Sequence, residues 1–226
     1  MGMKTTKGQK GFSLLELIVA TTIMLILLSV VSTLIARAFS VRQRESRRAD
    51  ALVSVQAALN VISRDVANTG FGIYSDSLTR MPSNGIVLAD SDENRIHMRS
   101  NMWNQGDKDD CDNNVPDTAC RTDQPGEDVT YYLDPASQSI VRYDPNDTPT
   151  TSVVVNRVSS LRFRYFHYDP STGNVTDSAT PTATTSRVRI TVEAVLEQVV
   201  GQVNPSSVTY ESQVTLRNAS YMLKQY

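Results

Sequence analysis

The stretch that most restricts how this chain can fold is an unbroken apolar run near its N-terminus. From Leu14 to Ala36 the residues read LLELIVATTIMLILLSVVSTLIA, and Glu16 is the only charge among them. A helix needs about 20 apolar residues to cross the hydrocarbon core of a bilayer, and the part of the run after Glu16 reaches that length. The run therefore predicts a membrane-spanning helix with a single carboxylate near one edge.

Basic side chains flank this run on both sides. Lys4, Lys7 and Lys10 precede it with no acid among residues 1–11, whereas five arginines follow it between Arg37 and Arg48. By the positive-inside rule the lysines place the N-terminus in the cytoplasm, and the arginines pull the other way. The charges alone leave the orientation open.

The small-residue junction beside the run lies on an unusual side. A secretory signal carries its cleavage site after the apolar stretch, but here the junction Gly11-Phe12 comes before it. Cleavage at this junction would remove the basic leader, residues 1–11, and keep the apolar segment. The mature protein would then begin with Phe12 and carry its own hydrophobic helix at the N-terminus.

The segment KGFSLLELIVA, residues 10–20, resembles the cleavage and N-methylation motif of type IV prepilins and of the pseudopilins of type II secretion. The resemblance implies that a prepilin peptidase cuts after Gly11 and methylates the new amine of Phe12. It also implies that Glu16 pairs with the amine of a neighbouring subunit during assembly. A carboxylate inside a membrane helix costs roughly 2.5 to 3.5 kcal/mol, which such a pair would offset. The alternative is that Glu16 is solvated at the depth of the lipid headgroups.

The helical signal continues beyond the apolar run. No Gly or Pro occurs from Phe12 to Asn68, and Gly70 can take the left-handed conformation that follows a helix C-terminus. An apolar stripe at helical spacing is formed by Leu52, Val55, Leu59, Ile62 and Val66. We therefore expect one helix in two parts, a transmembrane or filament-core part over residues 12–36 and an amphipathic part over residues 37–69.

Residues 70–226 predict a β-rich extracytoplasmic domain. Alternating apolar and polar residues indicate strands at 85–89, 95–99, 129–133, 139–143, 152–155, 161–168, 186–196 and 208–218. Within 161–168, Leu161, Phe163 and Tyr165 share one face. The economical arrangement is one antiparallel sheet packed on the helix stripe. The fold class is therefore α+β, and the resemblance implies the same type IV pilin architecture.

Two later segments narrow the resemblance. Residues 62–73, ISRDVANTGFGI, are similar to the segment where minor pilins of the PilW type leave their helix, and residues 214–221, VTLRNASY, resemble their closing strand. The spanning helix lacks the proline that many major pilins have there.

An acidic loop is predicted at residues 104–128. It holds eight acidic side chains against Lys108 and Arg121, together with the two cysteines of the chain, Cys111 and Cys120. In an extracytoplasmic compartment these two thiols are expected to form a disulfide. Oxygen ligands of the kind that Ca²⁺ prefers are offered by Asp107, Asp109, Asp112 and Asp117. The match to an EF-hand loop fails, and a solvated surface loop is the alternative.

Composition and motifs exclude several classes of function. The formal net charge of −2 gives no basic surface for nucleic acid, so no nucleic-acid contact is supported. His97 and His167 are the two histidines, and no nucleotide-binding, zinc-protease or hydrolase motif gives either a role. We expect no enzymatic activity and no cofactor apart from the Ca²⁺ considered above.

Three functions remain open at this point. The first is a minor pilin that primes, assembles or caps a type IV pilus, with the prepilin peptidase, other minor and major pilins, the inner-membrane assembly machinery and the lipid bilayer as partners. It would reside in the bacterial inner membrane as a single-pass protein, N-terminus in the cytoplasm, and then in the fibre near the tip. The second is a J-like pseudopilin of type II secretion. The third is a membrane-anchored binding module that does not polymerise.

Overall fold

A computed structural model describes residues 13–76, 81–102, 122–169, 171–196 and 207–219. The chain divides into two compact units, with the division inside the long helix between Ser46 and Arg47. The first unit is Met1–Ser46 with Val199–Gly201, and the second is Arg47–Gln198 with Gln202–Tyr226. Each unit is described on its own below.

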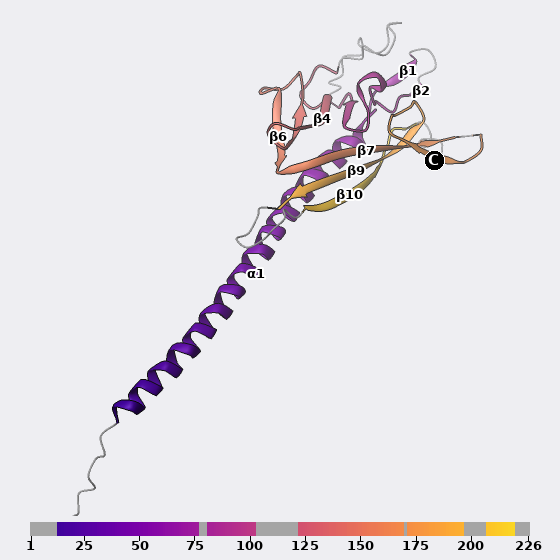
Figure 1. Cartoon of the computed structure of the whole chain (residues 1–226). Helices are drawn as coiled ribbons and strands as arrows, with labels where there is room; N and C mark the ends of the chain where they lie inside the picture. The colour runs from indigo at the N-terminus through magenta and orange to yellow at the C-terminus, as the bar shows by residue number, and fades with distance from the viewer. Residues whose placement is uncertain (1–12, 77–80, 103–121, 170, 197–206, 220–226) are drawn as a thin grey trace, which may run out of the picture. The chain divides into compact units, whose positions relative to one another are not determined.

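One helix, α1, runs from Leu14 to Asn68 over 55 residues (Figure 1). Its length follows from the absence of Gly and Pro in this stretch. Within the second unit, the predicted stripe is the buried face: Val55, Leu59, Ile62 and Val66 are buried together with Ala58. Leu52, at the start of the stripe, is half-buried.

Gly70 ends the helix in the conformation that the sequence predicted. Its φ is +80°, and its backbone N–H donates to the carbonyl of Arg99 at 2.9 Å. A Cβ at this position would lie 2.3 Å from the Ser83 carbonyl oxygen, so a side chain would clash. Gly85 lies against it, because a Cβ there would lie 2.2 Å from the Gly70 nitrogen. The two glycines let the chain leave α1 and pass directly beside the first strands.

Ten strands follow α1, and all of their pairings are antiparallel among the described residues. The first four-stranded sheet has the order β3-β4-β5-β6 and the second has the order β10-β9-β7-β8. The strands of the first sheet are β3 (Arg95–Arg99), β4 (Asp128–Asp134), β5 (Ser139–Tyr143) and β6 (Thr151–Asn156). Those of the second are β7 (Val158–Tyr168), β8 (Val175–Ser178), β9 (Thr185–Val195) and β10 (Ser207–Thr215). A two-stranded sheet is formed by β1 (Tyr74–Asp76) and β2 (Met81–Pro82).

A single core joins the buried face of α1 to both four-stranded sheets. It includes Ile62 of α1, Tyr131 of β4 and Phe163 of β7, all 0% exposed. Strand β9 alternates buried and half-buried residues along its length, as expected of a strand with one covered face. The predicted fold class, a long N-terminal helix packed on antiparallel β-structure, is confirmed.

The prediction of one sheet was wrong, because the strands form two four-stranded sheets and a two-stranded one. Residues 151–168 form a nearly continuous run of strand, but Arg157 interrupts it with a φ of +63°. That left-handed residue separates β6 from β7, so the two strands enter different sheets. Each sheet still places one face on the same core.

The strand predicted at residues 85–89 is also absent. Only Ile86 forms a bridge, to Met98, and Leu88–Asp90 is a short 3-10 helix, η1. The Ser91 hydroxyl accepts the His97 backbone N–H at 2.9 Å, which takes up a donor that a continued strand would have used. Strand β8 was not predicted because it has only four residues, most of them polar and exposed.

Candidate assembly segment and polar clusters

The first unit presents an apolar helix surface on every side. Between Leu14 and Phe39 its large hydrophobic side chains are 49% to 77% exposed, far more than a core helix would leave open. A helix that is apolar all round belongs in a bilayer or in the core of an assembly. Among the described residues, α1 is the one helix long and apolar enough to cross a membrane.

The three threonine hydroxyls within this segment are satisfied by the helix itself. Thr21 donates to the carbonyl of Ile18 at 3.0 Å, and Thr33 donates to that of Val30 at 2.7 Å. Thr22 bonds the same Ile18 carbonyl at 2.6 Å. Because each hydroxyl already has an acceptor, these residues add little cost to burial in an apolar medium.

Glu16 stands in contrast to those hydroxyls. It lies in the first turn of α1 and is exposed. Within the described residues its carboxylate has no hydrogen-bond or ion-pair partner. The segment thus offers one unsatisfied acid at the edge of a helix that needs an apolar environment. Gly11 and Phe12, the predicted cleavage and methylation residues, lie outside the described residues.

The predicted disulfide and calcium ligands also fall outside the described residues. These are Cys111 and Cys120, and Asp107, Asp109, Asp112 and Asp117. Within the part of the chain that is described, no group of three histidine, cysteine or acidic residues is placed to hold a metal ion. The disulfide and the calcium site therefore stay predictions.

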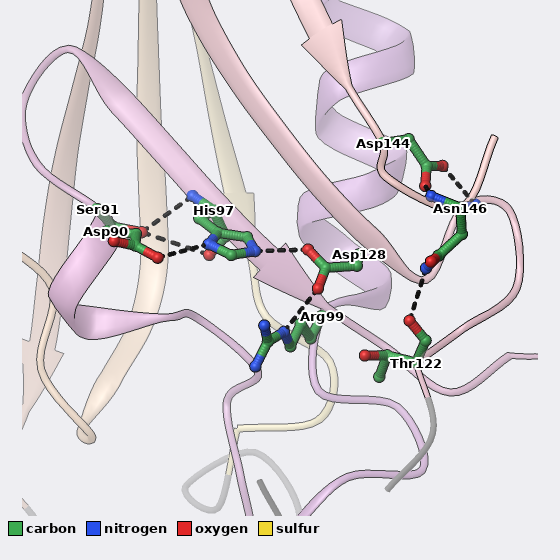
Figure 2. Close-up of polar contacts among 9 residues, drawn as sticks. Asp90, Ser91, His97, Arg99, Thr122, Asp128, Asp144 and Asn146 are labelled. Atoms are coloured by element: carbon green, nitrogen blue, oxygen red, sulfur yellow. Dashed lines mark hydrogen bonds and ion pairs between the residues drawn. The ribbon is translucent and has the colours of Figure 1, made fainter. Parts of the chain in front are cut away.

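The C-terminal end of the predicted acidic loop is held in place by a buried acid and its neighbour (Figure 2). Asp144 is 1% exposed, accepts the backbone N–H of Gly126 at 2.7 Å and receives Arg142 Nη2 at 3.0 Å. Asn146 donates from Nδ2 to the carbonyl of Thr122 at 2.7 Å. Asp144 therefore satisfies its charge with hydrogen bonds that hold residues 122–126 against the end of β5.

A second cluster ties α1 to the first sheet. Tyr131 donates its hydroxyl to Asp65 Oδ2 at 2.7 Å, and Arg142 Nε lies 3.8 Å from the same oxygen. Burial and the Asp65 carboxylate raise the pKa of Tyr131 above its ordinary value, so the phenol stays a donor. The cluster gives a polar anchor inside the core.

His97, on β3, lies between two carboxylates, which sequence reasoning missed (Figure 2). Its Nδ1 is 3.2 Å from Asp90 Oδ2 and its Nε2 is 2.5 Å from Asp128 Oδ1. Arg99 Nε bonds the other oxygen of Asp128 at 2.9 Å. Burial raises the pKa of Asp128, but the hydrogen bonds and charges of His97 and Arg99 outweigh it and leave that pKa below its ordinary value. No linear signal could have found this cluster, because its acids come from η1 and β4.

His167, on β7, has hydroxyl neighbours instead. Its Nδ1 lies 3.0 Å from Thr185 Oγ1 and its Nε2 lies 2.8 Å from Ser178 Oγ. Burial lowers the pKa of His167, against the opposing influence of Thr180 and Asp177. The Ser178 hydroxyl donates to the Thr180 carbonyl, so its proton is not offered to the imidazole. This geometry does not activate a serine nucleophile.

A groove of about 730 Å³ lies in the second unit between α1 and the ends of β6 and β9. Its lining is a mixture of small apolar and polar side chains: Arg47, Asp50, Ala51, Ser54, Val55, Ala57, Val154, Val155, Asn156, Arg157, Ala194, Val195 and Leu196. Among the described residues no histidine or cysteine lines it, and we assign it no chemistry.

Comparison with known proteins bears on the N-terminal segment. The model of the prokaryotic N-terminal methylation motif matches residues 6–32. The chain carries a prokaryotic methylation motif. The matched range contains Gly11, Phe12 and Glu16, and it runs into the exposed apolar part of α1. The motif and the exposed apolar helix behind it suggest membrane anchoring.

A structural comparison found a type IV-like pilin from Thermus thermophilus. The TM-score is 0.45 at 10% sequence identity, and the match covers 74% of this chain and 97% of that chain. No curated protein matches the chain. What the comparisons give for this chain is therefore the N-terminal motif and the helix that carries it.

Proposed function

We propose that this chain is a minor pilin that helps to prime, assemble or cap a type IV pilus. The observation that carries the proposal is the methylation motif at the start of α1, whose first part, residues 14–36, is apolar on all sides and has Glu16 as its one acid. A compact β-rich unit follows on the same helix. This arrangement suits a structural subunit that enters the filament through its helix and presents its β-rich unit outside the membrane.

Processing at Gly11 is the first step that the proposal requires. The peptidase would release residues 1–11, and this cleavage frees the α-amine of Phe12. The peptidase would then methylate that amine, which Glu16 of a neighbouring subunit would meet. We expect Gly11→Ala to leave an uncleaved precursor in the membrane, seen as a larger band on immunoblots and an unmethylated N-terminus by mass spectrometry. Normal trimming of this variant, or in cells without the peptidase, would contradict the prepilin assignment.

Glu16 provides the test of assembly. Glu16→Val should still insert in the membrane, since the change removes a charge from an apolar helix. Its amount in sheared filaments should fall several-fold because the intersubunit charge pair is lost. Glu45→Val, on the exposed part of the same helix, is the matched control and should enter filaments normally. Equal incorporation of the two variants would remove the assembly role of Glu16.

A gene deletion scored for surface pili and for secreted proteins separates the two machines. Loss of pili with normal secretion supports the minor pilin, for which we keep the PilW type as the proposed branch, whereas the reverse result supports a J-like pseudopilin. If Gly11 is cut and neither phenotype changes, a membrane-anchored binding module becomes the better description.

A further inference from the structure

The surroundings of His97 decide how many protons its ring must carry. Both ring nitrogens face carboxylate oxygens, Nδ1 that of Asp90 and Nε2 that of Asp128, at 3.2 and 2.5 Å. A neutral imidazole has one N–H and one lone pair, so it can donate to only one of these acids. The observed geometry satisfies both acids only when the ring is an imidazolium.

The charges around the ring agree with that form. The groups that face it are Asp90 from η1, Asp128 from β4 and, through Asp128, Arg99 from β3. With His97 protonated, two cations meet two anions. The neutral hydroxyl of Ser91 exchanges hydrogen bonds with the His97 backbone, at 2.9 Å from the N–H and 3.3 Å to the carbonyl.

The two acids are held to different degrees. The Asp128 side chain is 13% exposed and has Arg99 as a second partner, whereas the Asp90 side chain is 51% exposed. When the ring loses one proton, the shorter and more buried contact to Asp128 keeps the N–H. Nδ1 then presents a lone pair to Asp90, and the Asp90 carboxylate turns to solvent.

We propose that His97 is a pH-dependent clasp, which as an imidazolium holds the Asp90 side chain, at the end of η1, against β3 and releases that side chain when the ring is deprotonated. The backbone hydrogen bond from Val87 to His97 and the Ser91 contacts keep the turn in place, so the release changes the position of the Asp90 charge beside the exposed Leu88. The inference does not depend on the proposed function, because it concerns the fold around β3.

The test is the protonation state of the ring in the full chain, labelled with ¹⁵N-histidine and held in detergent micelles. The chain has two histidines, so His167→Gln leaves the His97 signals alone. Long-range ¹H–¹⁵N spectra between about pH 5 and pH 8 should show both nitrogens protonated at the acid end. The neutral form should keep its proton on Nε2, and the backbone amide shifts of the turn should follow the same titration.

Two matched variants on one turn make the test selective. Asp90→Asn removes the charge beside Nδ1, so the signals of the doubly protonated ring should be confined to a more acid part of the pH range than in the wild type. Asp92→Asn changes an acid two residues away whose oxygen accepts the backbone N–H groups of Asn94 and Arg95. This control should leave the titration in place.

Three results would each overturn the proposal. The first is a ring that is neutral throughout the range, and the second is a neutral form protonated on Nδ1. The third is an Asp90→Asn titration that overlays the wild type. His97→Gln gives a separate check, because the pH dependence of the turn amides should disappear; should that variant not fold, the Asp90 and Asp92 pair still decides the question.

Discussion

The two ends of α1 have the same helical geometry but satisfy their apolar side chains differently. In the N-terminal part, from Leu14 to Phe39, the large hydrophobic residues are all about half exposed or more. In the C-terminal part, one stripe that includes Val55 and Ile62 is closed off by the two sheets. Within the part of the chain that the structure describes, only the C-terminal part of α1 has its apolar stripe covered. The difference teaches that one continuous helix can be part of a folded core at one end and leave its apolar side chains exposed at the other.

A charge placed on the covered stripe should have the largest effect. Val55→Asp would bury a carboxylate at a position that is 1% exposed, which we expect to lower the free energy of unfolding by at least about 3 kcal/mol. Val53→Asp, two residues away and 65% exposed in the native chain, should have little effect. Pulse proteolysis in urea would compare them. Similar losses of unfolding free energy in both variants would mean that burial of the stripe does not stabilise the fold.

A charge in the apolar end should act on the membrane and leave the fold intact. Leu25→Arg, at a position 63% exposed, should cost roughly 2.5 to 3.5 kcal/mol of insertion free energy. Less protein should stay in carbonate-extracted membranes, while the urea midpoint of the second unit is unchanged. The control is Gln43→Arg, on the exposed helix beyond the apolar run. If Leu25→Arg also unfolds the second unit, the two ends are not separable.

The polar anchor between α1 and the first sheet comes next in size. Tyr131→Phe removes the hydroxyl that donates to Asp65 and should cost about 1 to 3 kcal/mol of unfolding free energy, since the acid loses its close donor in the core. Its neighbour Tyr132 is half-buried on the same strand, and Tyr132→Phe should be nearly neutral. Urea unfolding of the two variants measures the difference. Equal stability would show that solvent or Arg142 replaces the lost bond.

Sequence periodicity predicted the buried faces of α1 and β7 correctly, because a regular spacing of apolar residues indicates which face is covered. The stripe at Val55, Leu59, Ile62 and Val66 and the core face at Leu161, Phe163 and Tyr165 are buried as predicted. Periodicity could not predict the number of sheets, because the division between them depends on the left-handed backbone of one residue, Arg157. Nor could it find the His97 cluster, whose acids are 7 and 31 positions away. The N-terminal motif was readable because its residues are contiguous.

Hydroxyl groups provide the finest comparison between the two ends. In the apolar end, Thr33 donates to the carbonyl of Val30 in its own helix. In the covered end, Ser63 instead pairs with the Ser212 hydroxyl of β10, at 3.1 Å. Ser63→Ala should therefore cost about 0.5 to 1.5 kcal/mol of unfolding free energy, and a double-mutant cycle with Ser212→Ala isolates the pair.

The matched control for that cycle is Ser54, whose exposed hydroxyl donates to the Asp50 carbonyl of its own helix at 2.9 Å. Ser54→Ala should be close to neutral, because water replaces the hydroxyl and alanine favours the helix. A coupling energy between Ser63 and Ser212 near zero would mean that this contact only fills space. A measurable coupling would show that the covered end of α1 makes polar as well as apolar contacts with its sheet. The threonine hydroxyls of the apolar end donate instead to carbonyls of their own helix, which leaves that surface free for an apolar partner.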